Sequence, residues 1–128
     1  MKKYPLSVLL VVIICVLSLL PAQEFPESDV PFADKWVHWL MYGTLSFVFL
    51  WENRRFHRSD PQCTGIFSPT ALLLLSLAVA WGGLMELAQA YLTTTRSGDW
   101  LDFAANSFGV LCGSVIFVAV CAAMSRRA

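Results

Sequence analysis

Four long apolar stretches, separated by short polar segments, occupy most of this 128-residue chain. They run over about residues 4–22, 35–51, 69–92 and 100–124. A helix that crosses the hydrocarbon core of a membrane needs roughly 20 mainly apolar residues, and the stretches approach or exceed that length. The pattern therefore predicts an all-α, polytopic membrane protein, in which a bundle of four transmembrane helices takes up residues 1–128 as one domain.

The composition agrees with this interpretation. Hydrophobic residues make up 57% of the chain and charged residues 14%, whereas soluble domains average about 45–50% and about 25%. A soluble fold this small cannot bury such an excess of apolar surface. The formal net charge is zero, so nothing attracts the chain as a whole to nucleic acid.

The charges are segregated along the chain, and this predicts the orientation of the helices. Seven of the nine basic residues fall on one side of the four stretches, namely Lys2, Lys3, Arg54, Arg55, Arg58, Arg126 and Arg127. Basic loops stay in the cytoplasm, so we expect both termini to be cytoplasmic. The opposite side is acidic and carries Glu24, Glu27, Asp29, Asp34, Asp99 and Asp102.

The first stretch has an alternative interpretation as a cleaved signal peptide, because Lys2 and Lys3 precede an apolar run. Cleavage after Ala22 would place Leu20 where a signal peptidase requires a small residue. We therefore favour a retained helix.

Polar residues recur within the apolar stretches at helical spacing. Asp34, His38 and Tyr42 are four apart, and Glu86 and Gln89 are three apart, so each set shares one helix face. A third stripe, followed by two glycines, consists of Asp102, Asn106, Gly109 and Gly113.

These faces are predicted to meet in the outer leaflet. Glu86 lies about six residues inside its stretch, or roughly 9 Å deep at 1.5 Å per residue. Asn106 lies at a similar depth and His38 about half as deep. A charge facing lipid there would cost several kcal/mol, so we expect the faces to form one polar site or to line a wet cleft.

The order and spacing of these residues resemble the VanZ-like family of small bacterial membrane proteins. The resemblance covers about residues 34–114 and rests on Asp34-Lys35-x-x-His38-x-x-x-Tyr42, Glu86-x-x-Gln89, Arg96 and Asp99-x-x-Asp102-x-x-x-Asn106-x-x-Gly109-x-x-x-Gly113. It implies a multi-pass protein of the bacterial inner membrane and cell envelope. One branch of the family is associated with reduced susceptibility to teicoplanin, an antibiotic-resistance trait, and the resemblance implies no defined biochemical activity.

Several of these residues also have structural interpretations. Asp34 and Asp99 stand where helices should begin, so each can be an N-cap, and Asp102 can complete a capping box with Asp99. Gly109 and Gly113 form the GxxxG pattern of close helix packing. The Tyr42 hydroxyl is expected to bond to the polar cluster.

Glu86 is the hardest of these residues to explain structurally, because it lies within an apolar run. It is either a structural ion pair with Arg96 or Lys35, or a functional carboxylate. His38 likewise either makes a structural hydrogen bond, to Glu86 or Asp102, or takes part in function.

Metal or cofactor binding is not expected from the sequence. One histidine with carboxylates can ligate a metal, but there is no HExxH motif and no second paired histidine. The cysteines have no CxxC spacing that would indicate a zinc site or a disulfide framework; they are Cys15, Cys63, Cys112 and Cys121. Nucleotide-binding loops and serine-hydrolase elbows are absent as well.

Three functions remain open. The first is an accessory envelope protein whose polar site binds an envelope lipid or a glycopeptide-related ligand through Asp34, Lys35, His38, Tyr42, Glu86, Gln89, Arg96, Asp99, Asp102 and Asn106. The second is a membrane enzyme acting on an envelope lipid, with Glu86 and His38 as acid and base and Asp102 as a further candidate. The third is a transporter or flippase component that forms a homo-oligomer, for which the Gly109–Gly113 face offers a surface.

Overall fold

The computed structural model describes residues 3–21, 29–59 and 65–127. Within these ranges the chain is all-helical and has four helices: α1 (Pro5–Leu19), α2 (Ala33–Phe56), α3 (Pro69–Leu92) and α4 (Trp100–Arg127). Lys2, Glu24, Glu27 and Cys63, which the sequence singled out, lie outside the described residues.

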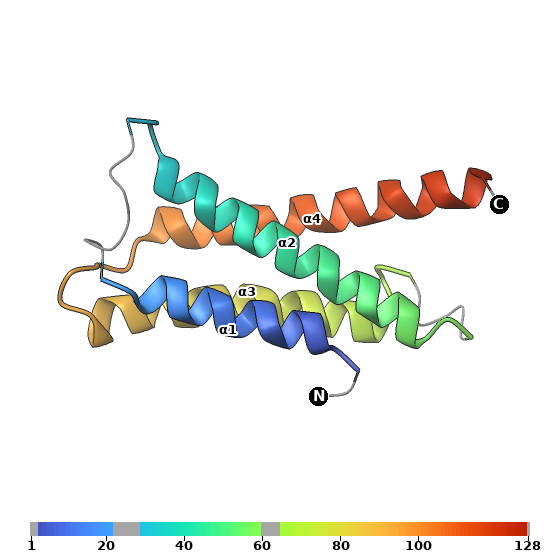
Figure 1. Ribbon diagram of the computed structural model, residues 1–128, viewed down its shortest axis with the longest axis horizontal. Coiled ribbons are helices and arrows are strands. Elements are labelled where there is room, and N and C mark those ends of the chain that lie inside the picture. Colours follow the sequence, from blue (N-terminus) through green and yellow to red (C-terminus); the bar gives the residue numbers. More distant parts are fainter. Residues whose placement is uncertain (1–2, 22–28, 60–64, 128) are drawn as a thin grey trace.

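The four helices alternate in direction along one long axis, so the described chain ends lie toward the same end of the bundle (Figure 1). Local sequence determines where the helices begin. Ser68 caps α3, since its side chain accepts the Ala71 N–H at 3.2 Å and Pro69 occupies the first turn. Asp99 caps α4 in the same way, accepting the Leu101 N–H at 2.8 Å.

Glycines allow α2 and α4 to approach each other closely. A Cβ at Gly109 would collide with the Trp39 carbonyl oxygen, and one at Gly113 would collide with that of Gly43. These glycines therefore pack against α2 of the same chain. This packing accounts for both glycines within one chain, and the homo-oligomer stays a prediction.

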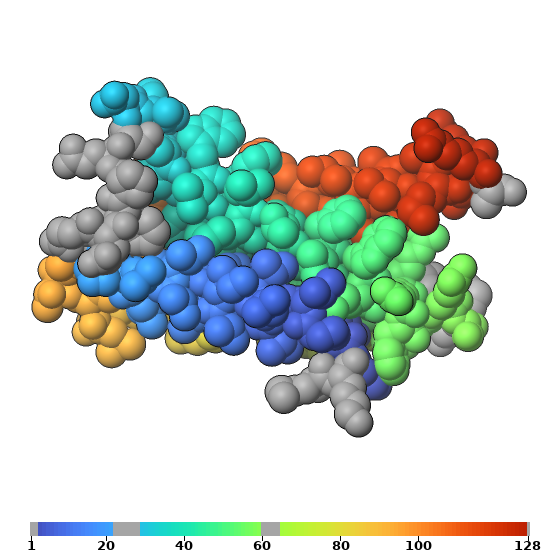
Figure 2. Space-filling view, viewed as in Figure 1, coloured from blue at the N-terminus to red at the C-terminus, as the bar shows by residue number. Residues whose placement is uncertain are grey.

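The interior of the bundle holds both apolar and polar side chains, and its outer surface is largely apolar. Its buried side chains include many polar ones, namely Ser7, Ser18, His38, Ser46, Glu52, Asn53, Glu86, Gln89, Asp102, Asn106 and Ser114. The outward faces carry exposed leucines and valines on all four helices, among them Leu9, Leu40, Leu73 and Val115. On the face shown in Figure 2, the apolar helix α1 lies over α3 and beside α2. Among the described helices, α3 and α4 are long and apolar enough to cross a membrane.

One buried carboxylate was not anticipated. The helix α2 continues past residue 51, where the apolar stretch ends, and this places Glu52 inside the bundle with 7% of its surface exposed. Its carboxylate accepts the N–H groups of Leu6 and Ser7, each at 3.0 Å, and the Ser7 hydroxyl at 2.6 Å. Glu52 therefore holds the first turn of α1 against α2. The predicted apolar stretch ends at residue 51, so the sequence placed Glu52 outside the helix.

Candidate functional site

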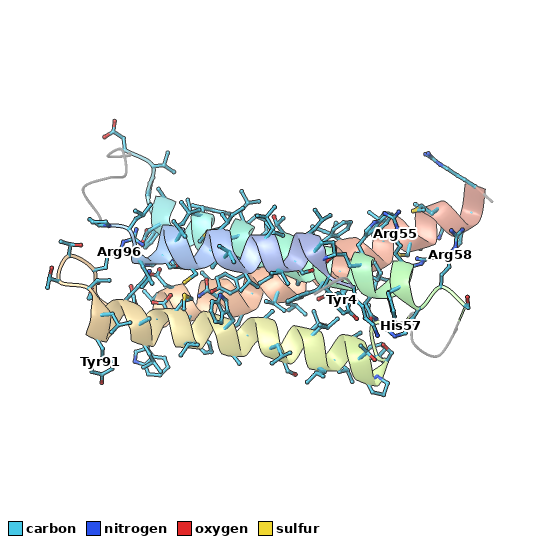
Figure 3. All side chains as sticks on the ribbon, turned by 60° about the horizontal axis from the view of Figure 1, so that its bottom comes forward. Tyr4, Arg55, His57, Arg58, Tyr91 and Arg96 are labelled. Carbon is cyan, nitrogen blue, oxygen red and sulfur yellow. The ribbon has the colours of Figure 1, made fainter. Side chains whose placement is uncertain are left out.

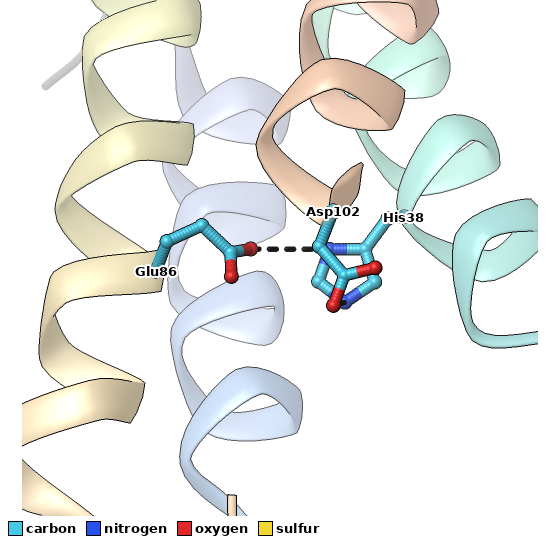
Figure 4. Close-up of side chains that lie close together, drawn as sticks. All are labelled: His38, Glu86 and Asp102. Carbon is cyan, nitrogen blue, oxygen red and sulfur yellow. Dashed lines mark ion pairs between the residues drawn. The ribbon is translucent and has the colours of Figure 1, made fainter. Parts of the chain in front are cut away.

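Polar side chains from α2, α3 and α4 come together near the end of the bundle where α4 begins. His38, Glu86 and Asp102 lie side by side (Figure 4), and each is more than nine-tenths buried. Asn106, one turn further along α4, is completely buried. Residues from three separate helices thus form one cluster, which we call the polar cluster.

Lys35 joins the carboxylates at the rim of this cluster. Its ammonium nitrogen lies 2.7 Å from Asp34 Oδ2, 3.0 Å from Asp99 Oδ2 and 2.8 Å from Asp102 Oδ1. The hydrogen bond from Lys35 lowers the pKa of Asp34. The pKa of Asp99 is lowered first by the Leu101 backbone N–H and then by Lys35. Both rim carboxylates are therefore ionised at neutral pH.

The capping interpretation holds for one of the two aspartates. Asp99 caps α4, but α2 begins one residue before Asp34, which lies within the first turn and caps nothing. Asp102 does not complete the capping box. Instead, Glu86 Oε2 accepts the Asp99 N–H at 3.1 Å, so a carboxylate from α3 takes this place at the start of α4.

Asn106 links the histidine to Glu86. The His38 Nδ1 atom lies 2.9 Å from Asn106 Oδ1, and Asn106 Nδ2 donates to Glu86 Oε1 at 3.4 Å. His38 is further from the two acids, with Nδ1 3.7 Å from Glu86 Oε1 and Nε2 4.0 Å from Asp102 Oδ2. The expected hydrogen bond from His38 to an acid is therefore replaced by one to Asn106.

Glu86 does not form the expected ion pair with Lys35, which contacts the three aspartates instead. Arg96 donates to the backbone of α1, to the Ser18 carbonyl at 3.1 Å and the Leu17 carbonyl at 3.4 Å. Gln89 donates to the same Ser18 carbonyl at 2.9 Å. Two predicted site residues thus hold the carboxyl end of α1.

The prediction for Tyr42 is half right. Its ring is fully buried in the core. Its hydroxyl, however, has no hydrogen-bond partner in the described part of the chain, so it is not bonded to the polar cluster.

A cavity of about 500 Å³ lies between the carboxyl end of α1 and the first turns of α2. Arg96, His38 and Asp34 contribute polar groups to its wall. The rest of the described wall is mostly apolar and consists of Leu17, Val30, Phe32, Ala33, Val37 and Met41, together with Ser18. Sequence reasoning could not find this cavity, because residues of α1 outside the recognised pattern form one side of it.

The cluster offers three groups that can bind a cation or move a proton. One donor atom from each of His38, Glu86 and Asp102 lies within 4.8 Å of the other two. An imidazole beside two carboxylates is chemically able to act as an acid and base pair or to ligate a divalent metal. The three described cysteines, Cys15, Cys112 and Cys121, are free and only partly buried.

Comparison with known proteins adds no relative. No protein-family model matches the chain, and neither a curated protein nor a solved structure does.

Proposed function

We propose that this protein is a VanZ-like, four-span protein of the bacterial inner membrane, in which both termini are cytoplasmic and an outward-facing cavity binds an anionic envelope lipid. The distribution of side chains supports the membrane location. Exposed apolar faces on all four helices are costly in water and favourable in lipid, and buried polar groups such as the Glu52 carboxylate and the Ser7 hydroxyl bond to each other inside the bundle.

The position of the arginines supports the orientation. Arg55 and Arg58 lie at one end of the bundle, and Arg96 lies at the other (Figure 3). Arg126 and Arg127 end α4, whose carboxyl end points in the same direction as that of α2 (Figure 1). Basic residues at a helix end favour the cytoplasmic side, so the polar cluster and the cavity face outward.

Reporter fusions test this orientation directly. Alkaline phosphatase fused after Arg58 is expected to be inactive, because the enzyme needs the oxidising outer compartment, whereas a fusion after Arg96 is expected to be active. Activity of the Arg58 fusion would refute the orientation.

The cavity is the observation that carries the lipid proposal. A lipid has a polar head and an apolar chain, and the cavity wall has the same two parts. Arg96 offers hydrogen-bond donors to an anionic head, while Leu17, Val37 and Met41 offer apolar contact to a chain. Arginine is well suited to phosphate because its guanidinium can bind two oxygens at once.

The expected contributions are sufficient for selective binding. A hydrogen bond to a charged group contributes about 1.5–3 kcal/mol, and each tenfold difference in affinity requires about 1.4 kcal/mol. Loss of the Arg96 contact should therefore weaken anionic lipid binding about 10-fold to 100-fold. Chain contacts add little selectivity, because a lipid chain leaves one apolar environment for another.

Native mass spectrometry on the purified full-length protein tests this binding. We expect polyprenyl phosphate and phosphatidylglycerol to be retained in preference to phosphatidylcholine. Arg96→Gln should abolish the preference, while Arg55→Gln, which removes an exposed arginine at the other end, should leave it unchanged.

Arg96 also holds α1, so a second variant avoids its structural role. Val37→Trp fills the cavity without removing a polar group and should prevent lipid retention. Leu87→Trp, which adds a similar volume at an exposed position of α3, is the matched control. Equal retention of neutral and anionic lipids would overturn the proposal, and so would binding of teicoplanin in place of lipid.

A further inference from the structure

We infer that the polar cluster is a binding site for one divalent transition-metal ion, ligated by His38, Glu86 and Asp102. Metal binding is not expected from the sequence, because the three residues are far apart along the chain and form no local motif. The fold brings them together from three helices, and one donor atom from each lies within 4.8 Å of the other two.

The donors are close enough to converge on a single ion. Oxygen and nitrogen ligands lie about 2.0–2.2 Å from zinc, so two ligands of a tetrahedral ion are about 3.3–3.6 Å apart. The His38 Nε2 and Asp102 Oδ2 atoms are 4.0 Å apart, and one donor atom from each of the three residues lies within 4.8 Å of the other two. Binding therefore requires the side chains to move together by roughly an ångström around the ion.

The hydrogen bonds of Asn106 determine which histidine nitrogen is available. The Asn106 amide group must present its nitrogen to the Glu86 carboxylate, since a carboxylate can only accept. Its oxygen therefore faces His38, whose Nδ1 must carry the hydrogen and donate it. The neutral imidazole then has its lone pair on Nε2, which faces the Asp102 carboxylate.

Two electron-rich atoms thus face each other in a buried place with no hydrogen between them. A cation held between the two atoms relieves this repulsion, and a metal ion does so while binding both of them.

The ligand atoms that do not face the ion have hydrogen-bond or ion-pair partners, as they do in known metal sites. Ligating histidines donate their second N–H to a neighbouring acceptor, and ligating carboxylates are themselves hydrogen-bonded. Here Asn106 bonds to His38, the Asp99 N–H bonds to Glu86 Oε2, and Lys35 forms an ion pair with Asp102 Oδ1. The atoms left to face a cation are His38 Nε2, Asp102 Oδ2 and Glu86 Oε1, the last of which also accepts from Asn106.

Charge also favours a cation. Lys35 is shared among three aspartates, and Glu86 adds a further buried carboxylate whose described partners are the Asp99 N–H, Asn106 and His38. Buried negative charge in excess is costly unless a cation compensates it. Because His38 also lines the cavity, an ion there would lie beside a bound anionic head group, which the acidic residues would otherwise repel.

Metal binding to the full-length protein can be measured without any anionic lipid. The protein is placed in phosphatidylcholine nanodiscs, stripped with a chelator and titrated with Zn²⁺, and bound metal is counted by mass spectrometry. We expect one ion per chain. Co²⁺ in place of Zn²⁺ should give visible absorption bands of a nitrogen- and oxygen-ligated site.

Variants locate the site. His38→Gln and Asp102→Asn should each lower the Zn²⁺ affinity at least 100-fold, and Asn106→Leu should lower it 10-fold to 100-fold through the orientation of His38. His57→Gln, which removes the other histidine at the opposite end of the bundle, should change the affinity less than threefold.

X-ray absorption at the zinc edge examines the wild type, so it does not depend on how well a variant folds. It should show scattering from one imidazole and oxygen neighbours only. Absence of a retained ion, sulfur ligands, or equal loss in the His57 variant would each overturn the metal site. Because no anionic lipid is present, failure here is distinguishable from failure of the lipid proposal.

Discussion

Removing the carboxylate of Glu52 is expected to release α1 from the rest of the bundle. This side chain is buried on α2 and its described partners all belong to the first turn of α1. One oxygen accepts the Leu6 N–H, and the other accepts both the N–H and the hydroxyl of Ser7. The first N–H groups of a helix have no partner within the helix, so the carboxylate satisfies groups that would otherwise be unpaired.

The magnitude follows from the number of bonds. A hydrogen bond to a charged group contributes about 1.5–3 kcal/mol, and the positive end of the α1 dipole adds about 0.3–1 kcal/mol. Glu52→Gln keeps one accepting oxygen and loses the charge, which should lower the free energy of unfolding by about 2–3 kcal/mol. Glu52→Ala loses every bond and should cost about 3–5 kcal/mol.

Hydrogen exchange measured by mass spectrometry separates release of α1 from general destabilisation. If α1 opens more easily by 2 kcal/mol, its amides should exchange about 30-fold faster, while peptides from α3 and α4 change much less. Arg55→Gln alters the charge by the same amount at an exposed position on the same helix and should leave α1 unaffected. Exchange of α1 within threefold of wild type in Glu52→Gln would refute the reasoning.

Three further changes have clear expectations. Gly113→Ala should lower the thermal unfolding midpoint and cost at least about 1–3 kcal/mol, because its Cβ would collide with α2, whereas Gly65→Ala has no atom within 4 Å to meet and should be neutral. Tyr42→Phe should leave the midpoint unchanged or raise it, since the buried hydroxyl that it removes has no hydrogen-bond partner. The pKa of Asp99 lies below its usual 3.8, so its contribution to stability is complete above about pH 5 and is lost as the pH falls through the folded value. A Lys35→Met variant should therefore show a shallower loss of stability in acid-unfolding curves.

Much of the fold could be predicted because apolar helices carry their own signal. The stretch predicted over residues 69–92 coincides with α3, and the third polar stripe lies on α4 as its spacing indicated. The polar residues of α2, α3 and α4 could be assigned to one site because side chains at helical spacing share a face. Their partners within the site could not be assigned, and Asn106 rather than an acid contacts His38.

Three polar side chains bond to backbone groups of α1, and these partners could not be predicted from the sequence. Glu52 accepts N–H groups of α1, while Arg96 and Gln89 donate to its carbonyls. Every residue except proline has both backbone groups, so no residue type marks the segment that such a side chain will contact. A charged residue next to an apolar stretch, such as Glu52, is therefore predicted to lie outside the helix.

The buried acids at the two ends of the bundle differ in a way that separates structure from function. Glu52 accepts hydrogen bonds from three donors of one helix end, and these account for its burial. Glu86 and Asp102 are equally buried, but they come from two helices and lie beside the imidazole of a third. A protein that needed these residues only to join its helices would gain from replacing them with apolar side chains, because buried charges are rarely the most stable solution. The acids that gather around an imidazole are therefore the ones to which a ligand should be assigned first.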